Sequence, residues 1–261
     1  MPEHQLRNFT INFGPQHPAA HGVLRLVLEL DGETVRSCAP TIGYLHTGIE
    51  KTIEQKKWQQ VIPLVERMDY LSAQSNSMAF CLSVEKLLGL EVPERVTNIR
   101  LLIAELQRIN SHLVWLGTHA MEIGAVSVMM YAFREREQIL NIFEMIAGFR
   151  MFPSYMRIGG LREDLPRGFH AAVRSFLDRF APKLDEYEDL LTKNEIYLKR
   201  TQGVGVISKH AAVAYSLVGP IARAAGVSYD VRKAFPYNGY ETLDFTVPVQ
   251  TGGDVYARYL V

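Results

Sequence analysis

The stretch from Pro93 to Leu116 reads PERVTNIRLLIAELQRINSHLVWL. Its apolar residues recur at every third or fourth position and form one stripe, made of Val96, Ile99, Ile103, Leu106, Ile109, Leu113 and Leu116. Such a period predicts a long helix that buries one face. Pro93 suits the start of this helix, because the first helical turn has no partner for the N–H that proline lacks.

Three further segments on either side of this stretch have a helical period. We expect helices over residues 69–88, 127–147 and 166–192. Gly89 and Gly148 follow the first two, and a glycine directly after a helix favours its termination. Pro182 lies within the third segment, so we expect that helix to be interrupted or kinked there.

The N-terminal part has a strand-like pattern instead. Residues 9–13 suggest a short strand, and residues 24–30 place leucine at every second position. Asp31-Gly32 then favours a hairpin turn, with the returning strand over residues 34–39. Between the strands, the segment 14–22 reads GPQHPAAHG. Its prolines and glycines are incompatible with a helix and predict a stiff, defined loop.

The remainder of the chain has weaker patterns. Residues 203–207 and 245–247 suggest short strands, and residues 256–261 resemble the first turns of an amphipathic helix. Because that helix would be cut short, we expect the natural chain to continue beyond Val261. Together these patterns predict an α+β fold. A small antiparallel β region over residues 1–45 carries the GPQHPxxHG loop, and a mainly helical body over residues 46–261 is incomplete at its C-terminal end.

Composition narrows the class of protein. The chain has 261 residues, and its 28 Lys and Arg balance its 28 Asp and Glu. No basic excess points to nucleic acid, and a near-neutral chain suits a subunit of an assembly. Residues 1–7 contain no apolar segment, so we expect no secretory signal. The charge-free stretches 71–84 and 109–121 are too short to span a bilayer.

Cysteine and histidine spacing disfavours a metal site. Cys38 and Cys81 are the only cysteines. They form no C-x-x-C pair, so we expect no iron–sulfur cluster or cysteine-based zinc site and interpret both as buried, reduced thiols. His17 and His21 are four residues apart, but Pro18 breaks the helix that would place both on one face. A metal hydrolase using this pair therefore stays a minor alternative, and no nucleotide-binding glycine motif occurs.

Certain polar residues lie in rigid or apolar surroundings: His21, the run Arg67-Met68-Asp69-Tyr70, and Glu122. Histidine and tyrosine suit the reduction of a quinone, because its two carbonyl oxygens each need a hydrogen-bond and proton donor. A carboxylate beside the histidine would favour its protonated form. Spacing alone does not bring these residues together. Taken singly, Tyr70 is equally a buried helix tyrosine, and Glu122 a partner of a nearby arginine.

Several runs resemble the complex I 49 kDa subunit family, whose bacterial members are the D subunits of NADH-quinone oxidoreductase. The similarity extends in order from about Phe9 to Val261. The runs that carry it are 14–22 (GPQHPxxHG), 42–51 (IGYLHTGIEK), 67–70 (RMDY), 133–137 (FRERE), 157–160 (RIGG) with 164–166 (DLP), and 229–233 (YDVRK).

The resemblance implies a fold related to the large subunit of nickel–iron hydrogenases. In those enzymes cysteine pairs bind the metal. The segment 67–72, which corresponds to the first pair, contains no cysteine, so the resemblance implies that this chain binds no nickel. The family uses the space left by the metal for the head group of a quinone.

Matched to the family by position, His21 and Tyr70 would be the two donors to the quinone oxygens. Asp69 and Arg67 would line the same wall, and His17 lies in the adjoining loop. Glu122 falls where family members usually have aspartate. Its extra methylene keeps the charge but moves it outward, so pairing with His21 stays an open question.

A second group would lie near an iron–sulfur cluster of a partner subunit: Arg150, Phe152 and Arg157. Several family members have histidine at the position of Phe152. Because phenylalanine cannot titrate, we expect the redox potential of that cluster to be nearly independent of pH. A low-potential quinone such as menaquinone is a possible corollary.

The resemblance therefore implies a proton-translocating NADH:quinone oxidoreductase, in which this subunit is inactive alone and binds no cofactor itself. NADH, FMN and iron–sulfur clusters would be bound by partners. These are an iron–sulfur subunit at the quinone site, a neighbouring hydrophilic-arm subunit and a membrane-arm subunit. The complex would lie at the cell inner membrane, with this chain peripheral on the cytoplasmic side. Alternatives are a relative that accepts electrons from ferredoxin or another donor, and a non-catalytic paralogue.

Overall fold

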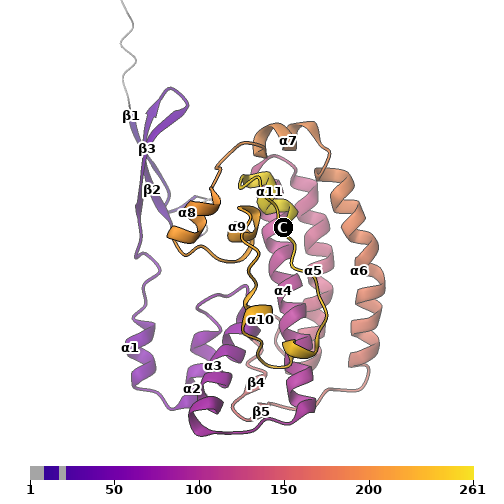
Figure 1. The fold of residues 1–261 in the computed structure, drawn as a ribbon. Coiled ribbons are helices and arrows are strands. Elements are labelled where there is room, and N and C mark those ends of the chain that lie inside the picture. The colour runs from indigo at the N-terminus through magenta and orange to yellow at the C-terminus, as the bar shows by residue number, and fades with distance from the viewer. Residues whose placement is uncertain (1–8, 18–21) are drawn as a thin grey trace, which may run out of the picture. The chain divides into compact units, whose positions relative to one another are not determined.

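The computed structural model describes residues 9–17 and 22–261. The described chain forms two compact units, which divide between Lys57 and Trp58 (Figure 1). The first is a small sheet unit, and the second is mainly helical. The predicted α+β composition is thereby confirmed. His21 lies outside the described residues.

The first unit contains a three-stranded antiparallel sheet in the order β1-β2-β3. Its strands are β1 (Phe9–Phe13), β2 (Arg25–Asp31) and β3 (Thr34–Thr41), followed by helix α1 (Ile49–Glu54). Gly32 turns the hairpin at a φ of 61°, in the left-handed region that favours glycine. The strand predictions for residues 9–13, 24–30 and 34–39 are confirmed. The expectation of a buried Cys38 is wrong, because this thiol is exposed on β3.

The second unit is built around two long helices. Helix α4 (Glu94–Glu122) packs along α5 (Val126–Ala147), and α5 also packs against α6 (Phe169–Leu191). On its other side α4 contacts α3 (Ala73–Leu88), which follows the short helix α2 (Trp58–Val65). Figure 1 shows α4 and α5 running side by side through the centre of this unit.

The apolar stripe of α4 enters the core as predicted. Ile99, Ile103, Leu106 and Leu113 are buried, while Val96, Ile109 and Leu116 are partly buried. Gly117 lets α5 approach closely, because a Cβ there would lie 3.2 Å from Met129 Cα. The residue types on this face of α4 therefore fix how closely the two helices pack.

Two helix boundaries differ from the sequence prediction. Helix α3 begins at Ala73 rather than near residue 69, because residues 69–72 form a turn in which the Ser72 N–H donates to the Asp69 carbonyl. Helix α6 begins at Phe169, after Gly168, and Pro182 lies inside one continuous helix. An interruption at Pro182 is therefore not observed. Both predicted glycine ends are confirmed, with Gly89 and Gly148 in the left-handed conformation.

The rest of the second unit consists of short elements. A two-stranded sheet of β4 (Met156–Arg157) and β5 (Gly160–Leu161) follows α5. After α6 the chain forms α7 (Glu195–Thr201), α8 (Lys209–Ala214), α9 (Gly219–Ala224), α10 (Val231–Ala234), η2 (Tyr240–Thr242) and α11 (Val255–Leu260). The helix predicted over residues 256–261 is confirmed.

The strands predicted over residues 203–207 and 245–247 are wrong. Both segments are irregular. Backbone groups of the first bond to a distant loop instead of to a strand, as the Ile207 N–H donates to the Gly253 carbonyl at 2.9 Å. Within the described residues, no helix is both long and apolar enough to cross a membrane.

Candidate functional site

The turn that carries Arg67, Asp69 and Tyr70 lies between α2 and α3 and is held from two sides. The Asp69 carboxylate accepts the Leu71 N–H at 3.2 Å, and the Asn76 amide donates to the Asp69 carbonyl at 3.0 Å. From α4, the Gln107 amide donates to the Leu71 carbonyl at 2.6 Å. These bonds fix the backbone on both sides of Tyr70, whose side chain remains 40% exposed.

A buried carboxyl group anchors the start of this turn. Glu66 is fully buried and accepts hydrogen bonds from the hydroxyls of Ser77 and Ser154, each at 2.8 Å. Burial raises the pKa of this carboxyl, and the hydroxyl bonds oppose that rise. Sequence reasoning missed Glu66. Its position four residues after the buried Ile62 was the available signal, because i and i+4 share a helix face.

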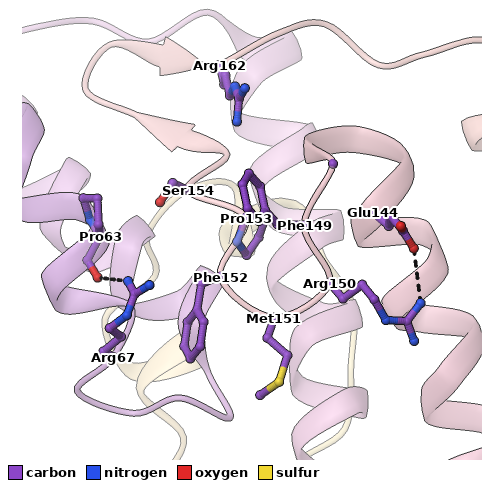
Figure 2. Close-up of a pocket in the computed structure, with 11 residues that line it drawn as sticks. Pro63, Arg67, Glu144, Phe149, Arg150, Met151, Phe152, Pro153, Ser154 and Arg162 are labelled. Carbon is purple, nitrogen blue, oxygen red and sulfur yellow. Dashed lines mark hydrogen bonds and ion pairs between the residues drawn. The ribbon is translucent and has the colours of Figure 1, made fainter.

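Beside the turn lies a cavity of about 600 Å³, shown in Figure 2. It is lined by Pro63, Arg67, Glu144, Gly148, Phe149, Arg150, Met151, Phe152, Pro153, Ser154 and Arg162. The Arg67 Cζ lies 4.6 Å from the centre of the Phe152 ring. An Arg67 Nη1 hydrogen bond to the Pro63 carbonyl, at 2.6 Å, holds the guanidinium over that ring.

The opposite wall of the cavity is held by Arg150, just after α5. Its guanidinium pairs with Glu137 and, at 3.2 Å, with Glu144, and it donates to the Asn141 amide oxygen at 2.7 Å. The loop that follows exposes apolar surface, since Phe149 is 58% exposed. The cavity therefore combines arginine side chains with an exposed apolar loop, a composition typical of protein interfaces.

A buried ion pair positions the segment that contains Arg157. Arg100 forms two hydrogen bonds to the Glu85 carboxylate, at 2.7 and 2.9 Å. The same guanidinium donates to the Arg157 and Gly160 carbonyls at 2.7 and 3.0 Å. Glu85 also accepts the Gly159 N–H at 2.7 Å. The β4–β5 turn is thus fixed through its backbone by two core side chains, which sequence reasoning did not identify.

The structure brings some of the sequence-predicted site residues together and separates others. Arg67, Arg150 and Phe152 line one cavity. Glu122 ends α4 fifteen residues after Gln107, which is about 22 Å along a helix that rises about 1.5 Å per residue. It therefore lies half a helix away from the point where Gln107 contacts the turn.

Of the histidines predicted for the site, His17 belongs to the first unit. His17 packs its ring against Phe13, with 4.0 Å between ring centres. His21 lies outside the described residues. The two histidines of α4 differ: His119 is partly buried and bonds the Tyr197 hydroxyl at 3.1 Å, while His112 is exposed. Among the described residues, no group of three or more His, Cys, Asp or Glu side chains could bind a metal.

A second, more apolar cavity of about 800 Å³ lies between α4, α6, α9 and α11. Its lining includes Leu113, Leu116, Phe180 and His112. None of the residues predicted for the quinone site lines this cavity. We therefore take the first cavity, with the turn beside it, as the candidate site.

Comparison with known proteins bears on what this site does. A family model described as the respiratory-chain NADH dehydrogenase 49 kDa subunit matches residues 122–261. A D subunit of NADH-quinone oxidoreductase from Roseiflexus sp. (strain RS-1) is 59% identical over 251 residues, which cover 96% of this chain and 60% of that protein.

Other relatives give the same result. A D subunit of NADH-quinone oxidoreductase from Chloroflexus aurantiacus is 59% identical, over 96% of this chain and 61% of that protein. The corresponding D subunit from Geotalea uraniireducens is 54% identical, over 97% of this chain and 65% of that protein. The chain thus spans somewhat under two thirds of the length of these curated relatives.

Proposed function

Since this chain belongs to the respiratory-chain NADH dehydrogenase 49 kDa subunit family, we propose that it forms the quinone-reduction site of an NADH:quinone oxidoreductase together with partner subunits. Electrons from NADH reach this site through FMN and iron–sulfur clusters held by partners. The quinone accepts two electrons and two protons and leaves as the quinol.

The observation that carries the proposal is the stacking of Arg67 on Phe152 directly before the turn that presents Tyr70. Arg67 lines the cavity, and Tyr70, which carries the phenol, follows it by only three residues in the chain. A cationic wall suits a neighbouring cluster that gains negative charge on reduction. An electron donor docked at this cavity would therefore lie close to an acceptor held beside Tyr70.

In this proposal Tyr70 and His21 donate protons to opposite oxygens of the quinone. Tyr70 suits the role because its exposed phenol lies on a turn whose backbone is fixed by Asn76 and Gln107. Asp69 is engaged by the Leu71 N–H, so its role is to shape the turn. Glu122 is proposed to balance the charge of His21, because it falls where members of the family usually have aspartate.

Arg150 and Phe152 are assigned to the surface that faces the partner cluster. Arg157 is assigned to the same surface through the β4–β5 turn, whose backbone is fixed by Arg100. The helical body is proposed to share the architecture of nickel–iron hydrogenase large subunits. The absence of cysteine from residues 67–72 supports a quinone rather than a metal at the corresponding place.

The proposed location and neighbours of the chain assume that it works within such a complex. The chain is peripheral, on the cytoplasmic side of the cell inner membrane, between an iron–sulfur subunit, a further hydrophilic-arm subunit and a membrane-arm subunit. Quinone reduction drives proton translocation by the membrane subunits.

Purification of the complex through a tag on this chain tests the proposal. We expect flavin- and cluster-containing subunits to co-purify, and NADH to reduce an added quinone. Co-purification of these subunits with electron entry from reduced ferredoxin alone would exclude NADH as the donor. A chain that purifies without any redox subunit would overturn the proposal.

A further inference from the structure

Arg136 on α5 is a buried charge without a counter-ion. Only 9% of its surface is exposed. Among the described residues, no hydrogen bond or ion pair reaches its guanidinium, and its Nε is fully enclosed without a partner. The contact it does make is with the Phe133 ring, whose centre lies 5.5 Å from Cζ.

The surroundings cannot neutralise this charge. The carboxylate that acts on it electrostatically is Glu137, which is already engaged by Arg150. Arg150 itself adds a repulsive positive charge. Burial lowers the pKa of Arg136, because a cation loses hydration in an apolar setting, and the attraction of Glu137 opposes this only in part.

Other buried charges in the described part of the chain are compensated. Arg100 pairs with Glu85, Glu135 pairs with Arg134, and Asp230 pairs with Arg232. Glu66 accepts two hydroxyl hydrogen bonds. An uncompensated guanidinium is costly enough that proteins almost always supply a partner. Arg136 therefore points to an anion that comes from outside the described residues.

We propose that Arg136 receives a carboxylate side chain of a partner subunit, which docks along one side of α5. This inference rests on the chain working within a multisubunit complex. Val126, Met129 and Phe133 precede Arg136 on the same side of the helix, at spacings of three and four residues, and Met129 and Phe133 also lie against Gly117 of α4, so this strip borders the contact between the two helices. Val126 is 57% exposed, and Met129 and Phe133 are partly buried.

The apolar strip favours a protein partner over a free anion. Arginine set in apolar surface is typical of the energetic centre of protein interfaces, where surrounding apolar contacts exclude water. A phosphate or lipid head group would instead be expected among several exposed cations. The docking residue is therefore an aspartate or glutamate, flanked by apolar side chains that cover Val126 and the part of Met129 that α4 leaves exposed.

Zero-length cross-linking of the intact complex tests the pairing directly. Arg136→Lys places an amine where the guanidinium was. A carbodiimide activates the facing carboxylate, the amine attacks it, and an amide forms as the urea leaves. We expect one new cross-link from position 136 to a carboxylate on another subunit. A link to Glu137 or another carboxylate of this chain, or no link, would overturn the proposal.

Arg136→Met tests the energetic role. We expect retention of the docked partner to be at least about tenfold weaker on salt washing, because its carboxylate loses a buried partner. The matched control is Arg179→Met on α6, where the guanidinium bonds only the Ser175 carbonyl. We expect that variant to retain all subunits.

Three results would contradict the proposal. One is an Arg136→Met complex with unchanged subunit retention. Another is loss of bound phospholipid or phosphate while every subunit stays. The third is failure of both Arg136 variants to accumulate, which would make Arg136 part of the fold. Because these readouts concern subunit content, they are independent of whether the complex reduces quinone.

Discussion

The guanidinium of Arg67 lies over the ring of Phe152, with 4.6 Å between Cζ and the ring centre. This contact places a permanent positive charge and a group that cannot titrate side by side at the wall of the cavity. If a partner cluster docks there, nothing at position 152 can change charge with pH. The redox potential of the cluster should then be nearly constant between about pH 6 and 8.

Phe152→His should introduce a pH dependence into that potential. A histidine titrates near pH ~6.5, and its protonated form stabilises the reduced cluster. The potential should therefore fall as pH rises, with a slope of up to about 59 mV per pH unit for one electron. EPR-monitored redox titrations of the complex measure this slope. Phe152→Leu is the control and should stay flat, and a steep slope in the unmodified complex would contradict the assignment.

Tyr70→Phe should abolish most quinone turnover without disturbing the fold. The variant removes one hydroxyl from an exposed side chain, so no packing is lost, but a proton donor disappears. General acid catalysis contributes at least about 100-fold, and NADH:quinone activity should fall by that order. Oxidation of NADH by an artificial acceptor that takes electrons from the flavin should be unchanged.

Tyr229→Phe is the matched control for Tyr70→Phe, because Tyr229 is similarly exposed but precedes α10 instead of lying on the turn between α2 and α3. It should retain full quinone activity. Equal activity in both variants would remove Tyr70 from the proposed mechanism.

Local sequence patterns predicted the elements whose hydrogen bonds and turn conformations involve residues close together in the chain. The hairpin follows from alternation and Asp31-Gly32, and the helix ends follow from Gly89 and Gly148. The predicted strand at residues 203–207 failed because its backbone groups bond partly to Gly253, far along the chain. Such a partner cannot be read from a local window. The exposure of Cys38 was likewise missed because it depends on how β3 is covered.

The candidate site could not be predicted in this way, because its residues are far apart in the chain. The convergence of Arg67, Arg150 and Phe152 joins segments separated by the whole of α3, α4 and α5. Only the family resemblance pointed to these residues beforehand. Glu66 could have been found from the helical phase of α2. Arg136 has the same helical phase as its apolar neighbours, but its missing counter-ion is visible only in three dimensions.

Glu66 should make stability depend on pH. Burial raises the pKa of its carboxyl above the ordinary value of 4.5, so the folded state binds this proton more tightly than the unfolded chain. The contribution of Glu66 to stability is therefore greatest below about pH 4.5 and declines as pH rises through the folded-state pKa. Glu66→Gln removes this titration while its amide can still bond Ser77 and Ser154.

Melting temperatures of the unmodified protein and Glu66→Gln, compared across pH, measure this effect. The difference should shift in favour of Glu66→Gln as pH rises from acid to neutral. A difference in melting temperature that is constant with pH, or that shifts the other way, would show that folding does not raise the pKa of Glu66. Ser154→Ala should strengthen the effect, because it removes one hydrogen bond that favours the carboxylate.

Breaking the Arg100–Glu85 pair should destabilise the second unit severely. Arg100→Met leaves a buried carboxylate without its cation, which costs about 3–5 kcal/mol. The Arg157 and Gly160 carbonyls lose their donor as well. The double variant with Glu85→Leu should recover only part of this loss, since the backbone of the β4–β5 turn remains unsatisfied. Denaturant unfolding measures both, and full recovery in the double variant would contradict the bracing role of this pair.

Gly253 should tolerate no side chain, unlike a nearby glycine with the same backbone strain. Both Gly203 and Gly253 have positive φ, at 70° and 64°. A Cβ on Gly203 would meet no atom within 4 Å, whereas a Cβ on Gly253 would lie 2.2 Å from the Ile207 carbonyl oxygen. Gly203→Ala should therefore cost about 1–2 kcal/mol from backbone strain alone.

Gly253→Ala should cost clearly more, because the clash forces apart two segments joined by the Ile207 N–H bond to the Gly253 carbonyl. The Gly253 N–H also donates to the Ala224 carbonyl, so the disturbance reaches the end of α9. Melting temperatures of the two variants measure the difference, and amide exchange at Ile207 reports where the structure opens. Equal melting temperatures would mean that the loop shifts freely, and that Gly253 is present for its φ rather than for the close approach of Ile207.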